Sequence, residues 1–300
     1  MKRTREQTIF IVLFLAPAFL LFTGFVAIPG VRALLYSLQK WDGLSTPEWV
    51  GLANFRELFT DDGVFLLALE HNAFLTLVAG SMVLSLSLFF AAVLHRRVRG
   101  ATVFRVAFFF PNVIASVAIA LLWVLLYSTT DFGVVNGALR WMETTLGWPD
   151  IDLPFPFTGK QYLIYSIVPM LVWTMTGFYM VLFLAAMEGI PETFYEVAEL
   201  EGASPLSQFW HVTLPLIREV LVVGIVFLAI TSLKLFEPVW IMDNEWPSRD
   251  THVMATLLYQ KVFSEYNVGY GSAVAVLLFV LVFFATLVTL RLSRREALEY

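Results

Sequence analysis

The chain has 300 residues, of which 59% are hydrophobic and 14% are charged, and its mean hydropathy is +0.76. A soluble domain usually contains about 25% charged residues, and a chain this apolar would expose large apolar patches in water. The composition therefore excludes an ordinary soluble domain and indicates a membrane protein. The net charge of −5 says little about orientation, which depends on where Lys and Arg lie in the chain.

The chain contains no cysteine, which excludes disulfides, thiolate nucleophiles and cysteine-based zinc sites. Its histidines are far apart and lack metal-ligand spacing: His71, His95, His211 and His252. We therefore predict no metal site and interpret the histidines as surface or interface residues. The phosphate-binding pattern G-x-x-x-x-G-K-[ST] is absent from the sequence, so we expect that the chain itself binds neither ATP nor another cofactor.

Six stretches are apolar over the roughly 20 residues that a helix needs to cross about 30 Å of hydrocarbon. In chain order they are 9–28, 73–94, 106–127, 162–187, 214–236 and 272–292. None has a charged residue near its centre, where each would cost about 2.5–3.5 kcal/mol. The sequence therefore predicts an all-α membrane protein with six transmembrane helices. We expect the first span to be retained and bent at Pro17, because its apolar run is too long for a signal peptide.

The positions of the basic residues predict the orientation of these spans. They cluster before the first span, between the second and third, and at the end of the last: Lys2, Arg3, Arg5, Arg96, Arg97, Arg99, Arg105, Arg291, Arg294 and Arg295. By the positive-inside rule these regions are cytoplasmic, and so are both termini. The longer connections, 29–72, 128–161 and 237–271, are then external.

The first external segment contains a predicted short helix over 54–59, with Asn54 as its N-cap. Its apolar residues Phe55, Leu58 and Phe59 are expected to lie on the membrane surface. The external segments are also rich in tryptophan: Trp41, Trp49, Trp141, Trp148 and Trp246. These side chains suit the headgroup layer, or alternatively a docking partner.

One connection predicted to be cytoplasmic, residues 188–213, contains no Lys or Arg but five glutamates. Its prolines and glycine predict two short helices: Pro191 suits a first helical position, and Gly202 suits the left-handed residue that ends a helix. Ser204 then resembles an N-cap, with Pro205 opening the second helix. Such a preformed block suits docking to a partner with basic groups. The alternative is an ordinary interfacial linker whose glutamates are solvated.

The same loop resembles the EAA signature of ABC-importer permeases, E-A-A-x-x-x-G followed nine residues later by I-x-L-P. It reads Glu196-Val197-Ala198, then Gly202, then Val212-Thr213-Leu214-Pro215, with conservative departures at Val197 and Val212. The resemblance implies a type I importer permease fold, with a cytoplasmic coupling-helix loop between spans four and five. It assigns contact with the ATPase to six residues: Glu196, Ala198, Gly202, Ala203, Leu214 and Pro215.

The likeness covers nearly the whole chain and is closest to permeases of the carbohydrate-uptake group, which handle maltose-like sugars, multiple sugars or glycerol phosphate. It implies a sugar importer in a bacterial or archaeal inner membrane. It divides the chain into a first helix and external segment (1–70), a type-1 permease domain (71–292) and a cytoplasmic tail (293–300). The usual Gly-Gly-Pro between spans five and six is replaced by residues 243–247, Asp-Asn-Glu-Trp-Pro, which puts receptor docking or gating in question.

The resemblance also implies partners. They are a second, unequal permease subunit, two ATP-binding cassette subunits that bind ATP and Mg, and an extracytoplasmic solute-binding protein. The lipid bilayer surrounds the chain, and no nucleic acid is involved. The chain itself is not expected to be an enzyme.

Candidate residues for the solute path lie in spans four and five, where polar and aromatic side chains interrupt the apolar run. They are Trp173, Thr174, Thr176, Gly177, Thr231, Ser232 and Lys234. Hydroxyls and an aromatic face suit a sugar, and of this set only Gly177 matches a family motif. The alternative is structural: buried Thr and Ser often bond helix to helix or their own carbonyls, and Lys234 can pair with Glu237 or reach the headgroups.

Three functions remain in competition. The preferred one is a permease driven by a separate ATPase, and the second is a transporter or channel that works alone. An intramembrane enzyme is third, because G-x-S-x-G, H-E-x-x-H and paired aspartates within spans are all absent from the sequence.

Overall fold

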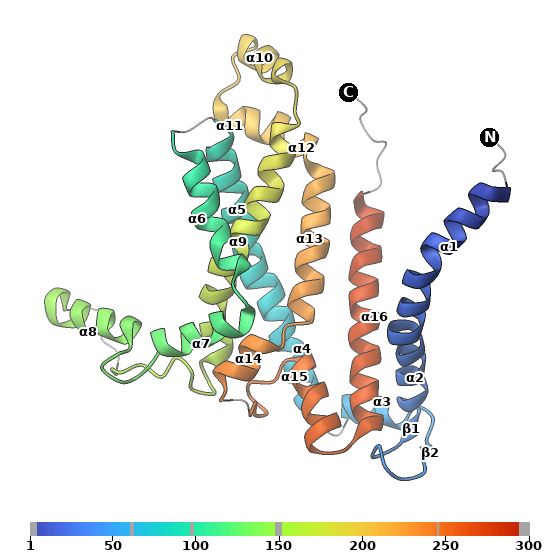
Figure 1. Ribbon diagram of the computed structural model, residues 1–300. Helices are drawn as coiled ribbons and strands as arrows, with labels where there is room; N and C mark the ends of the chain where they lie inside the picture. The colour runs from blue at the N-terminus through green and yellow to red at the C-terminus, as the bar shows by residue number, and fades with distance from the viewer. Residues whose placement is uncertain (1–4, 61–62, 97–98, 148–151, 245, 294–300) are drawn as a thin grey trace. The chain divides into compact units, whose positions relative to one another are not determined.

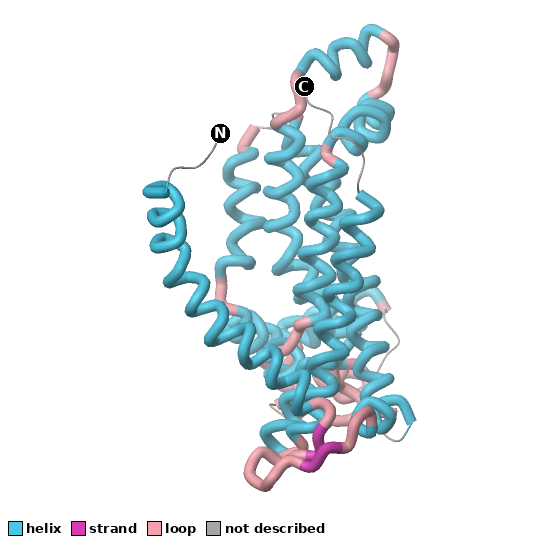
Figure 2. The backbone as a smooth tube through the Cα atoms, turned by 90° about the vertical axis from the view of Figure 1, so that its right-hand side faces the viewer, coloured by secondary structure: helices cyan, strands magenta, loops and turns pink. Residues whose placement is uncertain are grey.

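The computed structural model describes residues 5–60, 63–96, 99–147, 152–244 and 246–293. Within this part of the chain, helix dominates and strand occurs only in one short hairpin (Figure 2). The chain divides into two compact units. The N-terminal unit comprises Met1–Gly63 and Leu257–Phe279, and the main unit comprises Val64–Thr256 and Val280–Tyr300.

The N-terminal unit begins with a long apolar helix, Phe10–Tyr36, which extends beyond the predicted span 9–28. Its elements are α1 (Arg5–Phe22), the π-helix η1 (Thr23–Ala27), α2 (Ile28–Tyr36), β1 (Gln39–Lys40), β2 (Glu48–Trp49), α3 (Ala53–Thr60), the end of α15 (Met254–Tyr259), η4 (Gln260–Ser264) and the start of α16 (Val268–Ser293). The helix continues through Pro17. The wider π-turn of η1 comes two residues before Pro29, whose missing N–H leaves the carbonyl of Phe25 without its usual partner.

Asn54 joins α3 to the hairpin, in which Gln39 pairs with Trp49. The side-chain amide of Asn54 donates to the carbonyl oxygens of Ser37 at 2.8 Å and Gln39 at 2.9 Å. The predicted N-cap role of Asn54 is wrong. Helix α3 begins at Ala53, and the side chain of Asn54 forms its hydrogen bonds with these two carbonyls of the hairpin region.

The expected membrane-facing side of the short helix is only partly exposed. Leu58 is fully buried, so its predicted place on the membrane surface is wrong, whereas Phe59 remains 52% exposed. Hydropathy alone does not distinguish an apolar residue that faces lipid from one that is buried within the protein.

Asp42 closes the tip of the hairpin. Its carboxylate accepts the backbone N–H groups of Ser45 at 2.7 Å and Leu44 at 2.9 Å, and the Ser45 hydroxyl at 2.8 Å. These donors, the Ser45 N–H first, lower the pKa of Asp42 to about 2. The carboxylate therefore stays ionised, and the turn keeps its hydrogen bonds, at neutral pH.

The main unit is a bundle around α9. Its elements are α4 (Val64–Phe74), η2 (Leu75–Ala79), α5 (Gly80–His95), α6 (Ala101–Val113), α7 (Ser116–Leu126), α8 (Val134–Leu146), α9 (Leu163–Glu188), α10 (Glu192–Leu200), α11 (Pro205–Gln208), η3 (Phe209–Thr213), α12 (Leu214–Leu216), α13 (Arg218–Leu233) and α14 (Glu237–Met242). Helix α9 contacts α5, α6 and α13. Figure 1 shows α10 and α11 at one end of this unit and α7, α8 and α14 at the other.

Five helices in the described part of the chain are long and apolar enough to cross a membrane. They are Phe10–Tyr36, Val64–His95, Leu163–Glu188, Arg218–Met242 and Val268–Arg291. The number becomes six if α6 and α7, which are bent by 96° at their junction, are taken as one broken span. The all-helical architecture agrees with the sequence prediction. The five continuous helices overlap five of the predicted spans, and the bent pair α6 and α7 overlaps the predicted third span.

The predicted third span, 106–127, corresponds to two helices, α6 and α7, that meet at a sharp bend. The backbone becomes extended at Ile114 and Ala115, with ψ of 140° and 134°. Helix α7 then packs on α9 and α14, where Ile119 and Ala120 are buried in a common apolar cluster with Val239 and Met242. Hydropathy measures how apolar a segment is and not whether it is straight, so this packing preference was not visible in the sequence.

Gly177 sets the spacing between α9 and α6. A Cβ at this position would lie 1.9 Å from the carbonyl oxygen of Phe108 and 2.8 Å from the Cα of Phe109. Because both are backbone atoms, a larger side chain requires one helix to move. The glycine is therefore needed for close helix packing.

Gly177→Ala is predicted to lower the free energy of unfolding by about 1–3 kcal/mol, the usual cost of overpacking. The matched control is Gly137→Ala in α8, where a Cβ meets nothing within 4 Å. That change is expected to stabilise the helix by up to about 1 kcal/mol, because alanine has the higher helix propensity. Thermal unfolding of the detergent-solubilised variants measures both effects, and an equal stability of the two variants would contradict the packing role.

Candidate functional site

The connection between α9 and α13, residues 190–215, forms a helical elbow. Its first helix, α10, begins at Glu192, with Pro191 as an extended N-cap at ψ 134°. Pro191 was predicted at the first helical position and lies one residue earlier, because its ring fixes φ but leaves ψ free to be extended.

Gly202 ends α10 through a Schellman motif. Its φ is +80°, which is the left-handed conformation that glycine adopts without a Cβ penalty. The N–H of Ala203 bonds the carbonyl oxygen of Ala198 at 2.9 Å, and the N–H of Gly202 bonds that of Glu199 at 2.9 Å. Both bonds satisfy carbonyls that a helix end otherwise leaves unpaired. The predicted helix stop at Gly202 is confirmed.

The chain then returns through α11 and η3. The hydroxyl of Ser204 accepts the N–H of Ser207 at 3.3 Å, and Pro205 is the first residue of α11, as predicted. The π-turn of η3 precedes Pro215 by two residues, the same arrangement as η1 and Pro29. In this return segment Leu214 is half-buried and Pro215 is exposed.

The elbow exposes apolar side chains beside its glutamates. The exposed fractions are 39% for Phe194, 60% for Val197, 88% for Leu200, 67% for Leu206 and 56% for Trp210. Glu196 is also exposed, as are the other glutamates of α10. An apolar patch with an acidic rim is typical of a protein–protein interface.

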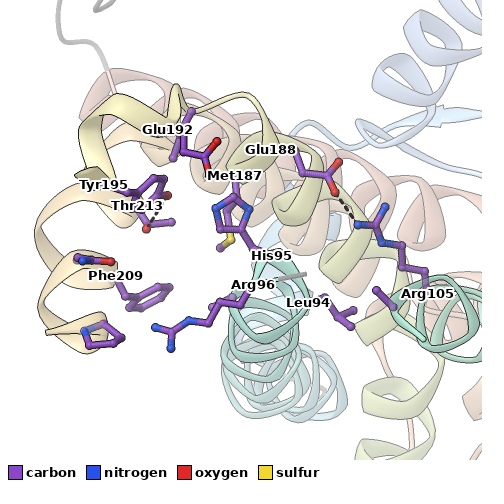
Figure 3. Close-up of a pocket in the computed structure, with 15 residues that line it drawn as sticks. Leu94, His95, Arg96, Arg105, Met187, Glu188, Glu192, Tyr195, Phe209 and Thr213 are labelled. Carbon is purple, nitrogen blue, oxygen red and sulfur yellow. Dashed lines mark hydrogen bonds and ion pairs between the residues drawn. The ribbon is translucent and has the colours of Figure 1, made fainter. Parts of the chain in front are cut away.

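A cavity of about 760 Å³ lies between the elbow and the ends of α5, α6 and α9 (Figure 3). Its polar lining includes His95, Arg96, Arg105, Glu188, Glu192, Tyr195 and Thr213. The Tyr195 hydroxyl bonds that of Thr213 at 3.0 Å, which ties α10 to η3. The basic turn after α5 and the acidic elbow therefore lie at the same end of the main unit.

An ion pair links α6 to the start of the elbow. Nη2 of Arg105 lies 2.5 Å from Oε1 of Glu188, the last residue of α9 (Figure 3). The two side chains are 38% and 49% exposed, so water screens the pair. The sequence contains both residues but gives no sign that they meet, because 82 residues separate them.

The predicted solute-path residues differ in how their polar groups are used. The hydroxyls of Thr174, Thr176 and Thr231 donate to carbonyl oxygens four residues back in their own helices, those of Met170, Val172 and Phe227. The hydroxyl of Ser232 accepts that of Thr76 at 2.8 Å. Trp173, Thr231 and Lys234 are exposed in the chain, whereas Thr176, Gly177 and Ser232 are buried.

The structure also brings together residues that the sequence analysis did not select. Nδ1 of His71 lies 2.7 Å from the carbonyl oxygen of His252. Its neighbour Asn72 is fully buried and bonds three backbone groups in α13 and α15. The sequence analysis placed Asn72 in the external connection 29–72, because polar residues precede the predicted span 73–94, whereas the structure places it in the continuous apolar helix Val64–His95. Within the described residues, no group of three or more His, Asp or Glu side chains could hold a metal ion.

The apolar helices of membrane-spanning length indicate a polytopic membrane protein. The exposed apolar residues of the elbow suit contact with a partner protein. Residues 83–297 match the family described as the binding-protein-dependent transport system inner membrane component. The match extends over more than half of the chain, and the chain belongs to this family. It is the permease subunit of an ABC importer, in which a separate subunit hydrolyses ATP.

Related proteins support the assignment along the whole chain. The chain is 32% identical to the diacetylchitobiose uptake system permease protein of Streptomyces coelicolor, over 92% of this chain and 80% of that protein. It is 27% identical to the multiple sugar-binding transport system permease protein of Streptococcus mutans, over 94% of each.

The fold is similar to that of a solved importer. A chain in the crystal structure of a bacterial alginate ABC transporter, in complex with alginate pentasaccharide-bound periplasmic protein, gives a TM-score of 0.80 at 20% identity. The match covers 98% of this chain and 96% of that one.

The Arg105–Glu188 pair is predicted to contribute less than about 1 kcal/mol to stability, because both side chains are partly exposed. A double-mutant cycle with Arg105→Ala and Glu188→Ala measures the coupling, and the exchanged pair Arg105→Glu with Glu188→Arg should restore it. The matched control is Arg140 with Asp131, 3.9 Å apart with the carboxylate fully exposed, where we expect no measurable coupling. A coupling energy of about 3 kcal/mol or more between Arg105 and Glu188 would contradict this prediction, because it would indicate that the ion pair is buried and not screened by water.

Proposed function

We propose that this permease imports a sugar or related carbohydrate, delivered by an extracytoplasmic solute-binding protein and driven by two ATP-binding cassette subunits, one of which docks on the elbow. The observation that carries the proposal is the elbow itself, a capped helix pair that exposes apolar residues beside glutamates. The carbohydrate assignment is supported by the names of the related permeases, which describe uptake of diacetylchitobiose and of multiple sugars.

The coupling role is assigned to the residues that shape the elbow. The exposed carboxylate of Glu196 is available for a basic group of the ATPase. Ala198, Gly202 and Ala203 form the tight turn, whose small side chains let a partner backbone approach. Leu214 and Pro215 begin the return to α13. ATP-driven closure of the two ATPase subunits would move this block and rock the helices between inward-facing and outward-facing states.

The solute path is assigned to spans four and five. Exposure favours Trp173, Thr231 and Lys234 as residues that touch solute, because an aromatic face stacks on a sugar ring and the polar groups bond its hydroxyls. In our proposal Thr174, Thr176, Gly177 and Ser232 support the wall of the path, because their polar groups or their close packing serve the helices themselves.

The orientation and assembly complete the proposal. Both termini and the elbow are cytoplasmic, the protein lies in a bacterial or archaeal inner membrane, and a second, unequal permease subunit completes the path. The proposed permease domain is 71–292, preceded by the first helix and external segment (1–70) and followed by a cytoplasmic tail (293–300). Except for Ser293, this tail lies outside the described residues, as do the basic residues Lys2 and Arg3.

Reconstitution separates this function from a transporter or channel that works alone. We expect liposomes with the complete complex and its binding protein to transport a labelled oligosaccharide only when ATP is present on the side of the membrane that carries the ATPase subunits. The same liposomes with a hydrolysis-deficient ATPase are the control. Flux through the purified chain without ATP would refute the proposal.

Gly202→Asp is predicted to leave membrane insertion intact but to reduce co-purification of the ATPase at least about tenfold. The substitution places bulk and negative charge at the docking turn, on a residue with φ of +80°. Gly147→Asp is the matched control, because Gly147 also ends a helix at positive φ, +67°, with open space around it. Recovery of the ATPase at the wild-type yield with Gly202→Asp would contradict the coupling role of the turn.

A further inference from the structure

The apolar helix Arg218–Met242, which corresponds to the predicted span five, is interrupted near one end. Helix α13 ends at Leu233, the backbone from Lys234 to Phe236 is not helical, and α14 begins at Glu237. A helix end leaves carbonyl groups without intrahelical partners, and in hydrocarbon such groups must find partners within the protein. Breaks of this kind in transporters often lie at solute sites.

Asn72 supplies side-chain partners for this break, in addition to the backbone N–H of Leu235, which bonds the carbonyl oxygen of Ser232 at 3.2 Å. Nδ2 of Asn72 donates to the carbonyl oxygen of Ser232 at 3.0 Å and, more weakly, to that of Leu233 at 3.4 Å. Its Oδ1 accepts the backbone N–H of Met254 at 2.8 Å. The side chain is fully buried. One amide therefore joins α4, the end of α13 and the start of α15, all within the main unit.

Thr76 adds a second attachment one turn further along. It lies in the π-turn η2, and its hydroxyl donates to that of Ser232 at 2.8 Å. Ser232 is thus held through both its carbonyl and its side chain. Because successive residues of a helix point about 100° apart, fixing Ser232 also fixes the direction of Thr231, which is exposed.

We propose that Asn72, assisted by Thr76, is a positioning residue of the solute path. It fixes the rotation of the C-terminal end of α13 about the helix axis and the residue at which the helix ends. Both determine whether the side chains of Thr231 and Lys234 face the proposed solute path. This inference rests on the proposed path in span five, since Asn72 itself is buried and touches no solute. A leucine of similar volume would fill the space, but it would remove the side-chain donor to the Leu233 carbonyl and the acceptor of the Met254 N–H. The Ser232 carbonyl would keep only the backbone N–H of Leu235, at 3.2 Å.

The absence of cysteine from the chain makes the test direct. Single variants Thr231→Cys and Lys234→Cys introduce a thiol at each presented position. Their rates of modification by the charged thiol reagent 2-(trimethylammonium)ethyl methanethiosulfonate are measured in the assembled importer. Thr130→Cys in the connection between α7 and α8, which is also exposed, is the control for general loosening.

Each thiol is then combined with changes at the attachment. Asn72→Asp keeps the acceptor for Met254 but loses both donors to the carbonyls. Thr76→Val loses the hydroxyl at nearly constant volume, and Thr76→Ser keeps it. We expect Asn72→Asp and Thr76→Val to change the modification rates at positions 231 and 234 about two- to tenfold, the range that loss of one hydrogen bond allows. Thr76→Ser should restore the original rates, and the rate at position 130 should stay constant.

Unchanged rates at positions 231 and 234 in Thr76→Val and in assembled Asn72→Asp would overturn the inference. A parallel change at position 130 would do the same, because it would indicate general destabilisation. If Asn72→Asp does not assemble, the comparison of Thr76→Val with Thr76→Ser decides. The path has a separate readout: modification at positions 231 and 234 in the otherwise unchanged chain should inhibit uptake. Uptake that persists would refute the proposed path, whereas the rates would still report on the role of Asn72.

Discussion

The constraint on which this structure depends is that every backbone N–H and C=O group in a lipid environment needs a partner inside the protein. Continuous helices meet this requirement by themselves, but this chain interrupts its apolar helices repeatedly. At the break after Leu233, the side chain of Asn72 and the backbone N–H of Leu235 bond the carbonyl groups at the end of α13. Near Pro29 and Pro215, where a ring replaces an N–H, the helix widens into a π-turn two residues earlier. The π-turns lie within a few residues of their prolines, whereas the break after Leu233 depends on a side chain from a distant helix.

The elbow obeys the same rule where the chain leaves the bundle. The Schellman bonds at Gly202 and the Ser204 cap satisfy the ends of both short helices, so the block does not need a partner to hold its shape. Tyr195 and Thr213 then join its two arms. In the proposed coupling role, a block with capped helices attached to α9 and α13 would transmit an applied force, whereas a linker without such bonds would absorb it.

The sequence predicted those features that are determined by neighbouring residues. The stop at Gly202 and the start at Ser204–Pro205 were predicted correctly, because turn chemistry acts over a few residues. Asn54 was assigned wrongly, because carbonyls of Ser37 and Gln39 compete for an amide that also suits a local cap. The bend between α6 and α7 and the meeting of Arg105 with Glu188 were not predicted, because they depend on packing between distant segments. Asn72 belongs to the same group: the sequence analysis placed it just outside the predicted span 73–94, and its three partners lie in distant segments.

The candidate path shows how burial refines a list made from residue types. A hydroxyl on a solute path must be reachable, and Thr176 and Ser232 are each exposed by less than a tenth. Their bonds to the carbonyl of Val172 and to Thr76 account for their polarity without a solute. Thr231 also bonds its own helix but remains exposed, and a hydroxyl that donates to a carbonyl still has lone pairs free to accept a bond. Exposed polar groups on this face are unfavourable against lipid, so water, a solute or another protein surface is the environment that they require.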